Sequence, residues 1–268
     1  MHSTVLSHGL GGWMPCHKRV LIDMDAMREV LSQLREKWKE VPGTTQERTY
    51  SYELLKMGDG ALLNHWNGLY ENNCAGPGYS VRGWYHDLYA PLAALKGQWL
   101  EVGSGLGFDG TFFASQGARV TFLDIVQDNL RVVERICKLK GISNVSFRYL
   151  DNMASIDTLD TYDVILAVGS LINAPKDLMS EERRFLGAKL KTQGRWLELC
   201  YPKRRWEREG SLEFSKWGKK TDGDRTPWVE WYDLEKLLHS LEPHCFDVIL
   251  NINFHGDDFN WFDLKKAS

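Results

Sequence analysis

The stretch Trp99-Leu-Glu-Val-Gly-Ser-Gly-Leu-Gly107 decides the fold of this chain. Its first half is a short apolar run of the kind that forms a buried strand, and its second half has a glycine at every other position. Glycines let the backbone turn sharply and approach a ligand that a Cβ atom would hold away. A strand that leads through such a loop into a helix is typical of the ligand-binding edge of an open α/β sheet.

From Gln98 onward the chain alternates strands and helices. Strands are expected at 98–102, 118–123, 145–149, 163–168 and 195–201, and helices at 108–116, 127–140 and 176–191, with a further helix near 229–241. Helical crossovers force parallel pairing, and so we predict a doubly wound sheet. The last two strands, 246–254 and 259–264, are joined by so short a link that they must form an antiparallel hairpin. The predicted fold is α/β, a mostly parallel seven-stranded sheet with a C-terminal antiparallel hairpin.

The residues before this alternation have a different character. Residues 22–40 have a helical pattern, glycines and prolines interrupt 41–80, and an aromatic-rich piece at 62–70 indicates a short helix. Another helix is expected at 81–95, with a kink or a break at Pro91. We therefore expect an N-terminal helical and aromatic-rich extension, 1–79, that forms part of a lid. The main domain is expected at 80–268, with an insertion at about 202–228.

The composition indicates a soluble protein of the cytoplasm. Its 268 residues, 43% of them hydrophobic, suffice for a full core, and a net charge of −3 gives no sign of a nucleic-acid-binding surface. The five cysteines are scattered and never form a Cys-x-x-Cys pair, which argues against a disulfide framework or a zinc ribbon. No apolar run approaches the length of a membrane span, and residues 1–18 lack the apolar segment of a secretion signal. We expect no membrane, nucleic-acid or metal partner.

The motif Glu101-x-Gly103-x-Gly105-x-Gly107, followed by Leu123-Asp124-Ile125, resembles the nucleoside-binding motifs of one enzyme family. These are the class I, Rossmann-like S-adenosylmethionine-dependent methyltransferases, here of the small-molecule type. The resemblance covers about residues 80–268 and includes the terminal hairpin. It implies S-adenosylmethionine as cofactor, S-adenosylhomocysteine as product, and no metal.

The resemblance also implies roles for individual residues. Asp124 would hold the ribose hydroxyls, Ile125 would pack on the adenine, and Arg82 could take the methionine carboxylate as a bidentate pair. Asp151 would meet the adenine amino group, with Asn152 supplying a backbone amide. The cofactor-binding residues expected in this way are Trp66, Arg82, Glu101, Gly103, Ser104, Gly105, Gly107, Asp124, Ile125, Asp151, Asn152 and Val168.

A nicotinamide-dependent dehydrogenase is the main alternative. Read from Gly105, the loop also spells Gly-x-Gly-x-x-Gly and ends at Gly110, which is the dinucleotide fingerprint. In that reading Glu101 would be a buried carboxylate with no task, and the one Tyr-x-x-x-Lys, Tyr52 to Lys56, precedes the loop. A module that binds the cofactor without catalysis also stays open, because methyl displacement needs no obligatory catalytic residue.

Two segments provide candidates for the substrate side. The aromatic segment 65–86 is expected to lie over the cofactor as a lid, although its rings could simply pack the lid onto the core. The insertion is rich in bases and tryptophans, which favours a pocket wall for an anionic or sugar-like substrate; the alternative is a solvated surface loop. The substrate-binding candidates are Tyr70, His86, Asn173, Arg204 and Asp258.

His255 at the tip of the terminal hairpin is the preferred candidate for a catalytic base, because histidine titrates near neutral pH. Tyr201, at the end of the fifth strand, is the second catalytic candidate. A plain hydrophilic turn is the alternative interpretation of the hairpin tip. The expected activity is methyl transfer to O or N of a small metabolite, such as an anionic or carbohydrate-like compound or a natural-product intermediate.

Overall fold

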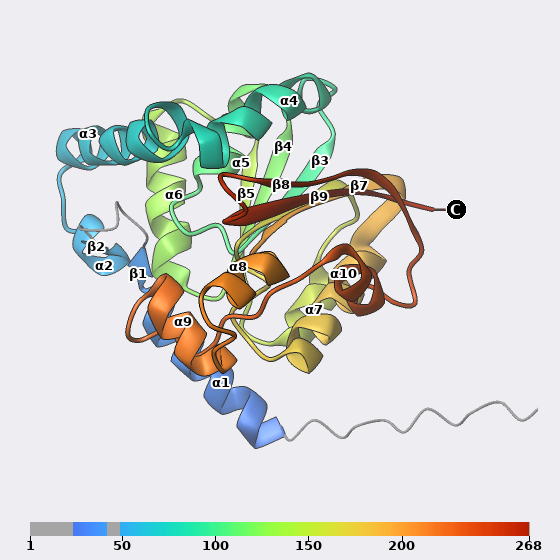
Figure 1. Cartoon of the computed structure of the whole chain (residues 1–268). Helices are drawn as coiled ribbons and strands as arrows, with labels where there is room; N and C mark the ends of the chain where they lie inside the picture. The colour runs from blue at the N-terminus through green and yellow to red at the C-terminus, as the bar shows by residue number, and fades with distance from the viewer. Residues whose placement is uncertain (1–23, 42–48, 268) are drawn as a thin grey trace, which may run out of the picture.

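The computed structural model describes residues 24–41 and 49–267. Its centre is a seven-stranded sheet in the order β5-β4-β3-β6-β7-β9-β8 (Figure 1). The strands are β3 (Gln98–Val102), β4 (Arg119–Asp124), β5 (Val145–Tyr149), β6 (Tyr162–Val168), β7 (Leu190–Cys200), β8 (Phe246–Phe254) and β9 (Phe259–Lys266). The strands from β3 to β7 pair in parallel, whereas β9 lies antiparallel to both β7 and β8. The predicted sheet with its terminal hairpin is confirmed.

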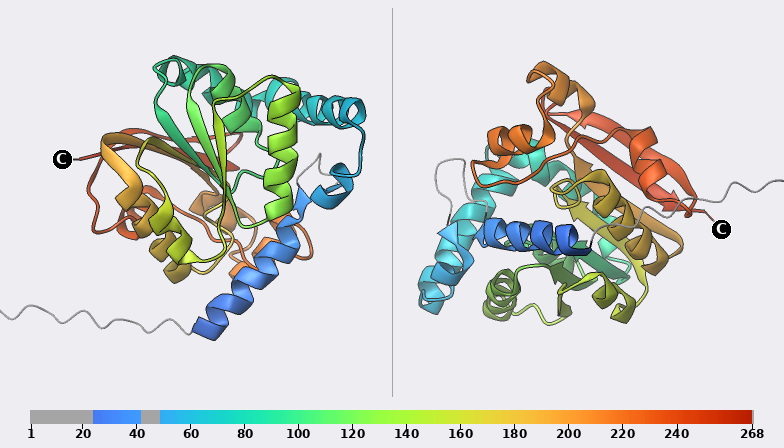
Figure 2. Two further views of the ribbon diagram at one scale, coloured as in Figure 1. Left: turned by 180° about the vertical axis from the view of Figure 1, so that it is seen from behind. Right: turned by 90° about the horizontal axis from the view of Figure 1, so that it is seen from below.

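Helices cover both faces of the sheet, as Figures 1 and 2 show. Successive residues of a strand point to opposite faces. Trp99 of β3 therefore packs in a cluster with α4 (Trp84–Ala93), α5 (Phe108–Ser115) and α6 (Gln127–Leu139). Its neighbour Leu100 packs in a second cluster with α7 (Lys176–Lys189), α10 (Leu234–Ser240) and the 3₁₀ helix Met153–Thr158.

Several expected elements differ from the structure in their bounds. Strand β7 begins at Leu190 rather than 195, because Leu190 already pairs with Tyr162 before a register shift in the ladder. Helix α10 begins only at Leu234, where the Asp233 carboxylate accepts a hydrogen bond from the Lys236 N–H as a cap. The expected break at Pro91 is wrong, since α4 continues through Pro91 to Ala93.

The N-terminal region packs against the sheet domain through α1 (Met24–Trp38), β1 (Glu40–Val41), β2 (Thr49–Tyr50), α2 (Ser51–Leu54) and α3 (Asp59–Tyr70). Two π-helical turns, Glu71–Ala75 and Tyr79–Gly83, lead from α3 into α4. Trp66 of α3 is buried with Leu106 and Phe108 of the glycine loop, and Leu34 of α1 belongs to the core on the α7 side. The expected helix start at 22 and the expected absence of a secretion signal concern residues outside the described ones. The domain boundary near 80 stays a prediction.

The insertion contains two short helices, α8 (Lys203–Arg208) and α9 (Phe214–Asp222). Helix α9 lies beside α1 below the sheet in Figure 1, and an ion pair of 2.7 Å between Arg225 and Glu40 joins the insertion to the N-terminal region. None of the helices in the described part of the chain is long and apolar enough to cross a bilayer.

Candidate functional site

A cavity of about 360 Å³ lies at the carboxyl ends of the central strands. The loops after β3, β4 and β6 form its floor, and the end of β7 and Phe259 of β9 form one side. Helix α1 contributes Leu31 and Leu34, and α9 contributes Thr221 and Asp222. The N-terminal extension and the insertion therefore both line the same cavity.

The glycine loop has left-handed backbone conformations that only glycine adopts without strain. Gly103 has a φ of +68°, and a Cβ on it would lie 2.4 Å from the Cβ of Ser170. Gly105 has a φ of +52°, and nothing lies within 4 Å of the place where its Cβ would be. Since Gly105 lines the cavity, this empty space allows a ligand to approach the backbone closely.

Asp124 closes β4 beside this loop and lines the cavity with Ser104 and Ile125. Its carboxylate accepts hydrogen bonds from the N–H of Gly105, at 2.9 Å, and of Val126, at 2.7 Å. Burial raises the pKa of Asp124 and these hydrogen bonds lower it, and the net value is about 6. Asp124 is thus mostly ionised at neutral pH; its contact with a ribose stays a prediction.

Three predicted cofactor residues lie behind the glycine loop and do not line the cavity. Trp66 donates a hydrogen bond of 2.8 Å from Nε1 to the carbonyl oxygen of Leu106. Glu101 accepts a bond of 3.1 Å from the N–H of Gly110, and burial raises its pKa well above the usual value. Gly107 caps the start of α5, and a Cβ on it would lie 2.6 Å from the side chain of Val133. These residues fix the shape of the loop.

The expected adenine contacts after β5 are also outside the cavity lining. The Asp151 side chain is 62% exposed, and Arg35 of α1 lies 3.4 Å from its carboxylate. Asn152 caps the 3₁₀ helix that follows. Leu150 lines the cavity at this point instead, together with Ile125.

Arg82 lines the cavity, whereas His86 and Tyr70 do not. The buried His86 lies with Nε2 at 2.7 Å from one carboxylate oxygen of Asp109, and Arg82 lies 3.4 Å from the other. Burial raises the pKa of Asp109, but Arg82 and His86 lower it more strongly, to about 2. Tyr70 stacks on Trp66 with a centroid distance of 5.3 Å. The aromatic segment is thus partly core, and Arg82 is its charged contribution to the cavity.

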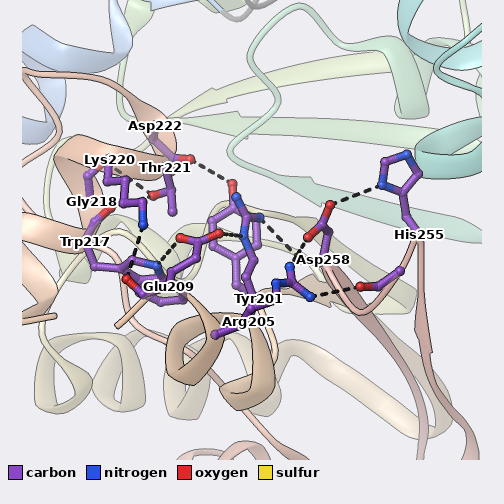
Figure 3. Close-up of polar contacts among 12 residues, drawn as sticks. Tyr201, Arg205, Glu209, Trp217, Gly218, Lys220, Thr221, Asp222, His255 and Asp258 are labelled. Atoms are coloured by element: carbon purple, nitrogen blue, oxygen red, sulfur yellow. Dashed lines mark hydrogen bonds and ion pairs between the residues drawn. The ribbon is translucent and has the colours of Figure 1, made fainter. Parts of the chain in front are cut away.

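A polar cluster lines the cavity at the β7 end. The Tyr201 hydroxyl donates a hydrogen bond of 2.7 Å to Asp222 (Figure 3). The Asn173 side-chain amide donates one of 3.1 Å to the other carboxylate oxygen. Burial raises the pKa of Tyr201 well above 10, so that its hydroxyl stays protonated. Burial also raises the pKa of Asp222, while its two donors and the charges of Arg205 and Lys37 lower it.

The sequence predicts Tyr201 and Asn173 as site residues but misses Asp222. Nothing in the sequence distinguishes Asp222 from the other acids of the insertion, because its position depends on how α9 folds back over the sheet. Val168, at the end of β6, lines the same cavity.

The polar side chains of the hairpin tip do not line the cavity, although Phe259, which follows Asp258, does. His255 is 42% exposed and its Nδ1 lies 3.5 Å from the carboxylate of Asp258, which also pairs with Arg208 (Figure 3). Arg204 is 74% exposed and lies 3.7 Å from Asp257. None of these residues lines the cavity, so the structure places them in a surface network rather than beside Asp124.

Comparisons with known proteins bear on the fold. No protein-family model matches the sequence, and no curated protein matches it. Among solved structures, the N-methyltransferase NodS from Bradyrhizobium japonicum WM9, in complex with S-adenosylhomocysteine, matches with a TM-score of 0.55 at 15% identity, over 81% of this chain and 97% of NodS. Magnesium protoporphyrin IX methyltransferase (ChlM) from Synechocystis PCC 6803, also with S-adenosylhomocysteine bound, matches with a TM-score of 0.56 at 14% identity, over 92% and 100%.

An S-adenosylmethionine-dependent methyltransferase from Clostridium acetobutylicum ATCC 824 matches with a TM-score of 0.57 at 9% identity, over 76% of this chain and 99% of that one. At such identities the likeness concerns the fold. This chain has the fold of the Rossmann-like, class I methyltransferases, as the glycine motif and the hairpin predict.

Proposed function

We propose that this chain, which has the class I methyltransferase fold, binds S-adenosylmethionine and transfers its methyl group to O or N of a small molecule. The observation that carries the proposal is the pairing of Gly105 with Asp124 at the edge of the cavity. An open backbone surface lies next to a buried, ionised carboxylate, and this combination suits a nucleoside whose ribose hydroxyls need an acceptor.

The lining residues fit the other parts of this cofactor. Ile125 and Leu150 offer an apolar surface for an adenine ring, and Arg82 offers a guanidinium for a carboxylate. The bound cofactor would supply an electrophilic methyl group. Gly169 and Ser170 would then lie between the cofactor and the β7 end of the cavity, where Tyr201 and Asn173 are.

The chain itself positions the two reactants and excludes water from them. Alignment of two reactants in a closed site can supply about 7–11 kcal/mol of the barrier. Helices α1 and α9 both line the cavity, and thus they would separate the reactants from bulk water.

The dehydrogenase alternative receives less support from the geometry. In the dinucleotide reading Gly110 would be the third glycine, which allows close packing of the helix on the strand, and its place inside α5 fits that role too. What the fingerprint does not account for is the buried Glu101 carboxylate beside it. A Cβ on Gly110 would lie 2.2 Å from the Glu101 carboxylate, so this glycine leaves room for Glu101. This also gives Glu101 a task, since its carboxylate accepts the Gly110 N–H.

Calorimetry with S-adenosylhomocysteine and NAD, each titrated into the full chain, tests the proposal. We expect S-adenosylhomocysteine to bind and Asp124→Ala to weaken its affinity about tenfold or more, because a bond to a charged acceptor is worth about 1.5–3 kcal/mol. Asp128→Ala is the matched control, since Asp128 is an acid of the neighbouring helix that does not line the cavity. Tight NAD binding without a response to S-adenosylhomocysteine would overturn the assignment.

A turnover assay separates an enzyme from a cofactor-binding module. The full chain is incubated with S-adenosylmethionine and a broad pool of small metabolites, and S-adenosylhomocysteine is measured. Cofactor binding without product from any pool would favour the module.

A further inference from the structure

The charged residues of the cavity are mostly carboxylates. They are Lys37, Glu40, Arg82, Asp124, Glu182 and Asp222. The two bases have acidic partners, since Lys37 lies 3.3 Å from Glu40 and Arg82 lies 3.4 Å from Asp109. No ion pair of Asp222 or Glu182 with a base occurs within 4.0 Å among the described residues. The cavity therefore has an excess of negative charge.

Asp222 can accept more hydrogen bonds than the protein gives it. A carboxylate has about four acceptor sites, and Tyr201 and Asn173 occupy one on each oxygen. Both donors also line the cavity, and together they hold the Asp222 carboxylate in a fixed orientation there. The cluster thus presents unused acceptor capacity to a ligand.

Glu182 on α7 is a second, independent sign of a missing donor. Its residue is only 7% exposed and lines the cavity, yet within residues 24–41 and 49–267 its carboxylate has no hydrogen-bond donor. The next residue, Arg183, does not supply one: its Nη2 binds Glu198 at 2.6 Å and the Leu171 carbonyl oxygen at 2.8 Å, and its Nη1 forms no hydrogen bond. The Glu182 carboxylate opens onto the cavity, and a ligand with N–H groups there would supply the donor that it lacks.

The bases of the insertion counter this charge only in part: the charge of Arg205 lowers the pKa of Asp222, but Arg205 forms no ion pair with it. Arg205 pairs with Glu209 at 3.0 Å, Arg208 pairs with Asp258, and Arg225 pairs with Glu40. None of these three bases lines the cavity, and the insertion contributes Thr221 and Asp222 instead. An anionic substrate, which the composition of the insertion favours, would therefore meet carboxylates.

The strand order separates this cluster from the proposed cofactor site. Asp124 ends β4, and β3 and β6 lie between β4 and β7, whose end carries Tyr201. If the nucleoside lies at Asp124, the β7 end of the cavity is left for the methyl acceptor.

We propose that the methyl acceptor is an amine and that the Asp222 carboxylate binds its nitrogen. This inference rests on the proposed function and gives the substrate class of the same site. An ammonium group has several N–H donors and a positive charge, and Asp222 can accept from it while it keeps Tyr201 and Asn173.

Asp222 also provides a place for the proton that an ammonium must lose before its nitrogen can act as a nucleophile. One N–H bond breaks, the proton moves to a carboxylate oxygen, and the electron pair stays on nitrogen. The ion pair of ammonium and carboxylate becomes a neutral amine and a carboxylic acid, so that charge and atoms balance.

Matched fragments test the proposal. Benzylamine, benzyl alcohol and benzoate differ only in the functional group, and their binding to the full chain is measured by ligand-observed NMR, with and without S-adenosylhomocysteine. We expect benzylamine to bind most tightly. Asp222→Asn should weaken the binding of benzylamine about tenfold or more, and the binding of benzyl alcohol much less. The matched control is Asp224→Asn, which removes the same charge from an exposed position outside the cavity.

Several results would overturn this inference. These are preferential binding of benzoate to the unaltered chain, no binding of benzylamine to it, and an unchanged benzylamine affinity in Asp222→Asn. A fourth is an equal loss of affinity for all three fragments in Asp222→Asn. The last result would show that Asp222 only supports the fold. The affinity for S-adenosylhomocysteine is also measured on each variant, and this keeps the two proposals apart. If the unaltered chain does not bind S-adenosylhomocysteine, the proposed cofactor is refuted. The ranking of the three fragments in the absence of S-adenosylhomocysteine tests the role of Asp222 alone.

Discussion

At the residue scale, Glu182 bears an electrostatic cost in the cavity. Burial, with a smaller contribution from the charge of Glu198, raises the pKa of Glu182 from 4.5 to about 7, although Arg183 lowers it. Below about pH 4 the carboxyl is protonated in the folded and the unfolded chain, and it adds no penalty. As the pH rises through 7, the Glu182 carboxyl loses its proton more easily in the unfolded chain than in the folded chain. The folded state therefore loses stability.

Glu182→Gln should remove this loss. The free energy of unfolding of the variant, relative to the unaltered chain, should rise by about 3 kcal/mol between about pH 4 and pH 8, because one pKa unit corresponds to about 1.4 kcal/mol. Urea unfolding at a series of pH values measures this difference in the absence of ligand. Glu181→Gln is the control, since Glu181 pairs with Arg184 at the surface. A flat difference for Glu182→Gln would mean that its carboxylate has a donor in solution.

At the scale of the element, the glycine loop combines two different requirements. Gly103 and Gly105 both have left-handed backbones, but only Gly103 has a neighbour, Ser170, in the place of a Cβ. Gly103 is therefore needed for packing between two loops, and Gly105 for access to the cavity.

Alanine at each position separates the two requirements. Gly105→Ala should cost about 1–2 kcal/mol of stability from backbone strain. It should also weaken the binding of S-adenosylhomocysteine strongly, because the methyl group of the alanine enters the cavity. Gly103→Ala should cost more stability, since the strain is combined with a clash at 2.4 Å. Thermal unfolding and calorimetry on both variants measure the two effects. If the two variants were equally stable and Gly105→Ala bound S-adenosylhomocysteine as tightly as the unaltered chain, the ligand would lie elsewhere.

At the scale of the whole molecule, segments far apart in the sequence close one cavity. Leu34 of α1 and Asp222 of α9 line it together, and Arg225 and Glu40 join the two segments at 2.7 Å. Both the extension and the insertion therefore contribute to a cover over the carboxyl edge of the sheet.

Ligand binding should stabilise this cover. We expect amide hydrogen exchange in α1 to slow when S-adenosylhomocysteine binds, because the ligand would contact residues of α1 that otherwise face an open cavity. Strand β8, at the far edge of the sheet, should show little change. Mass spectrometry of exchanged peptides makes the comparison. Protection of the glycine loop without protection of α1 would contradict a closing role for the extension.

The sequence by itself determined the sheet, the glycine loop and the acid that closes β4. These features depend on local patterns: a strand of alternating faces, glycines where the backbone turns, and a hairpin link too short for a crossover. The positions of Gly103, Gly105, Asp124 and Ile125 follow from the chain order alone, because the ends of neighbouring parallel strands meet at one edge.

Only the tertiary structure decided which polar residues face the cavity. Asp151 and His255 occupy predicted positions in the chain, but Arg35 contacts the former and the latter lies on the surface. Asp222 and Glu182 line the cavity because α9 and α7 orient them there, and nothing in their neighbouring residues indicates it. Burial and pairing depend on contacts between segments distant in sequence, and these contacts exist only once the chain has folded.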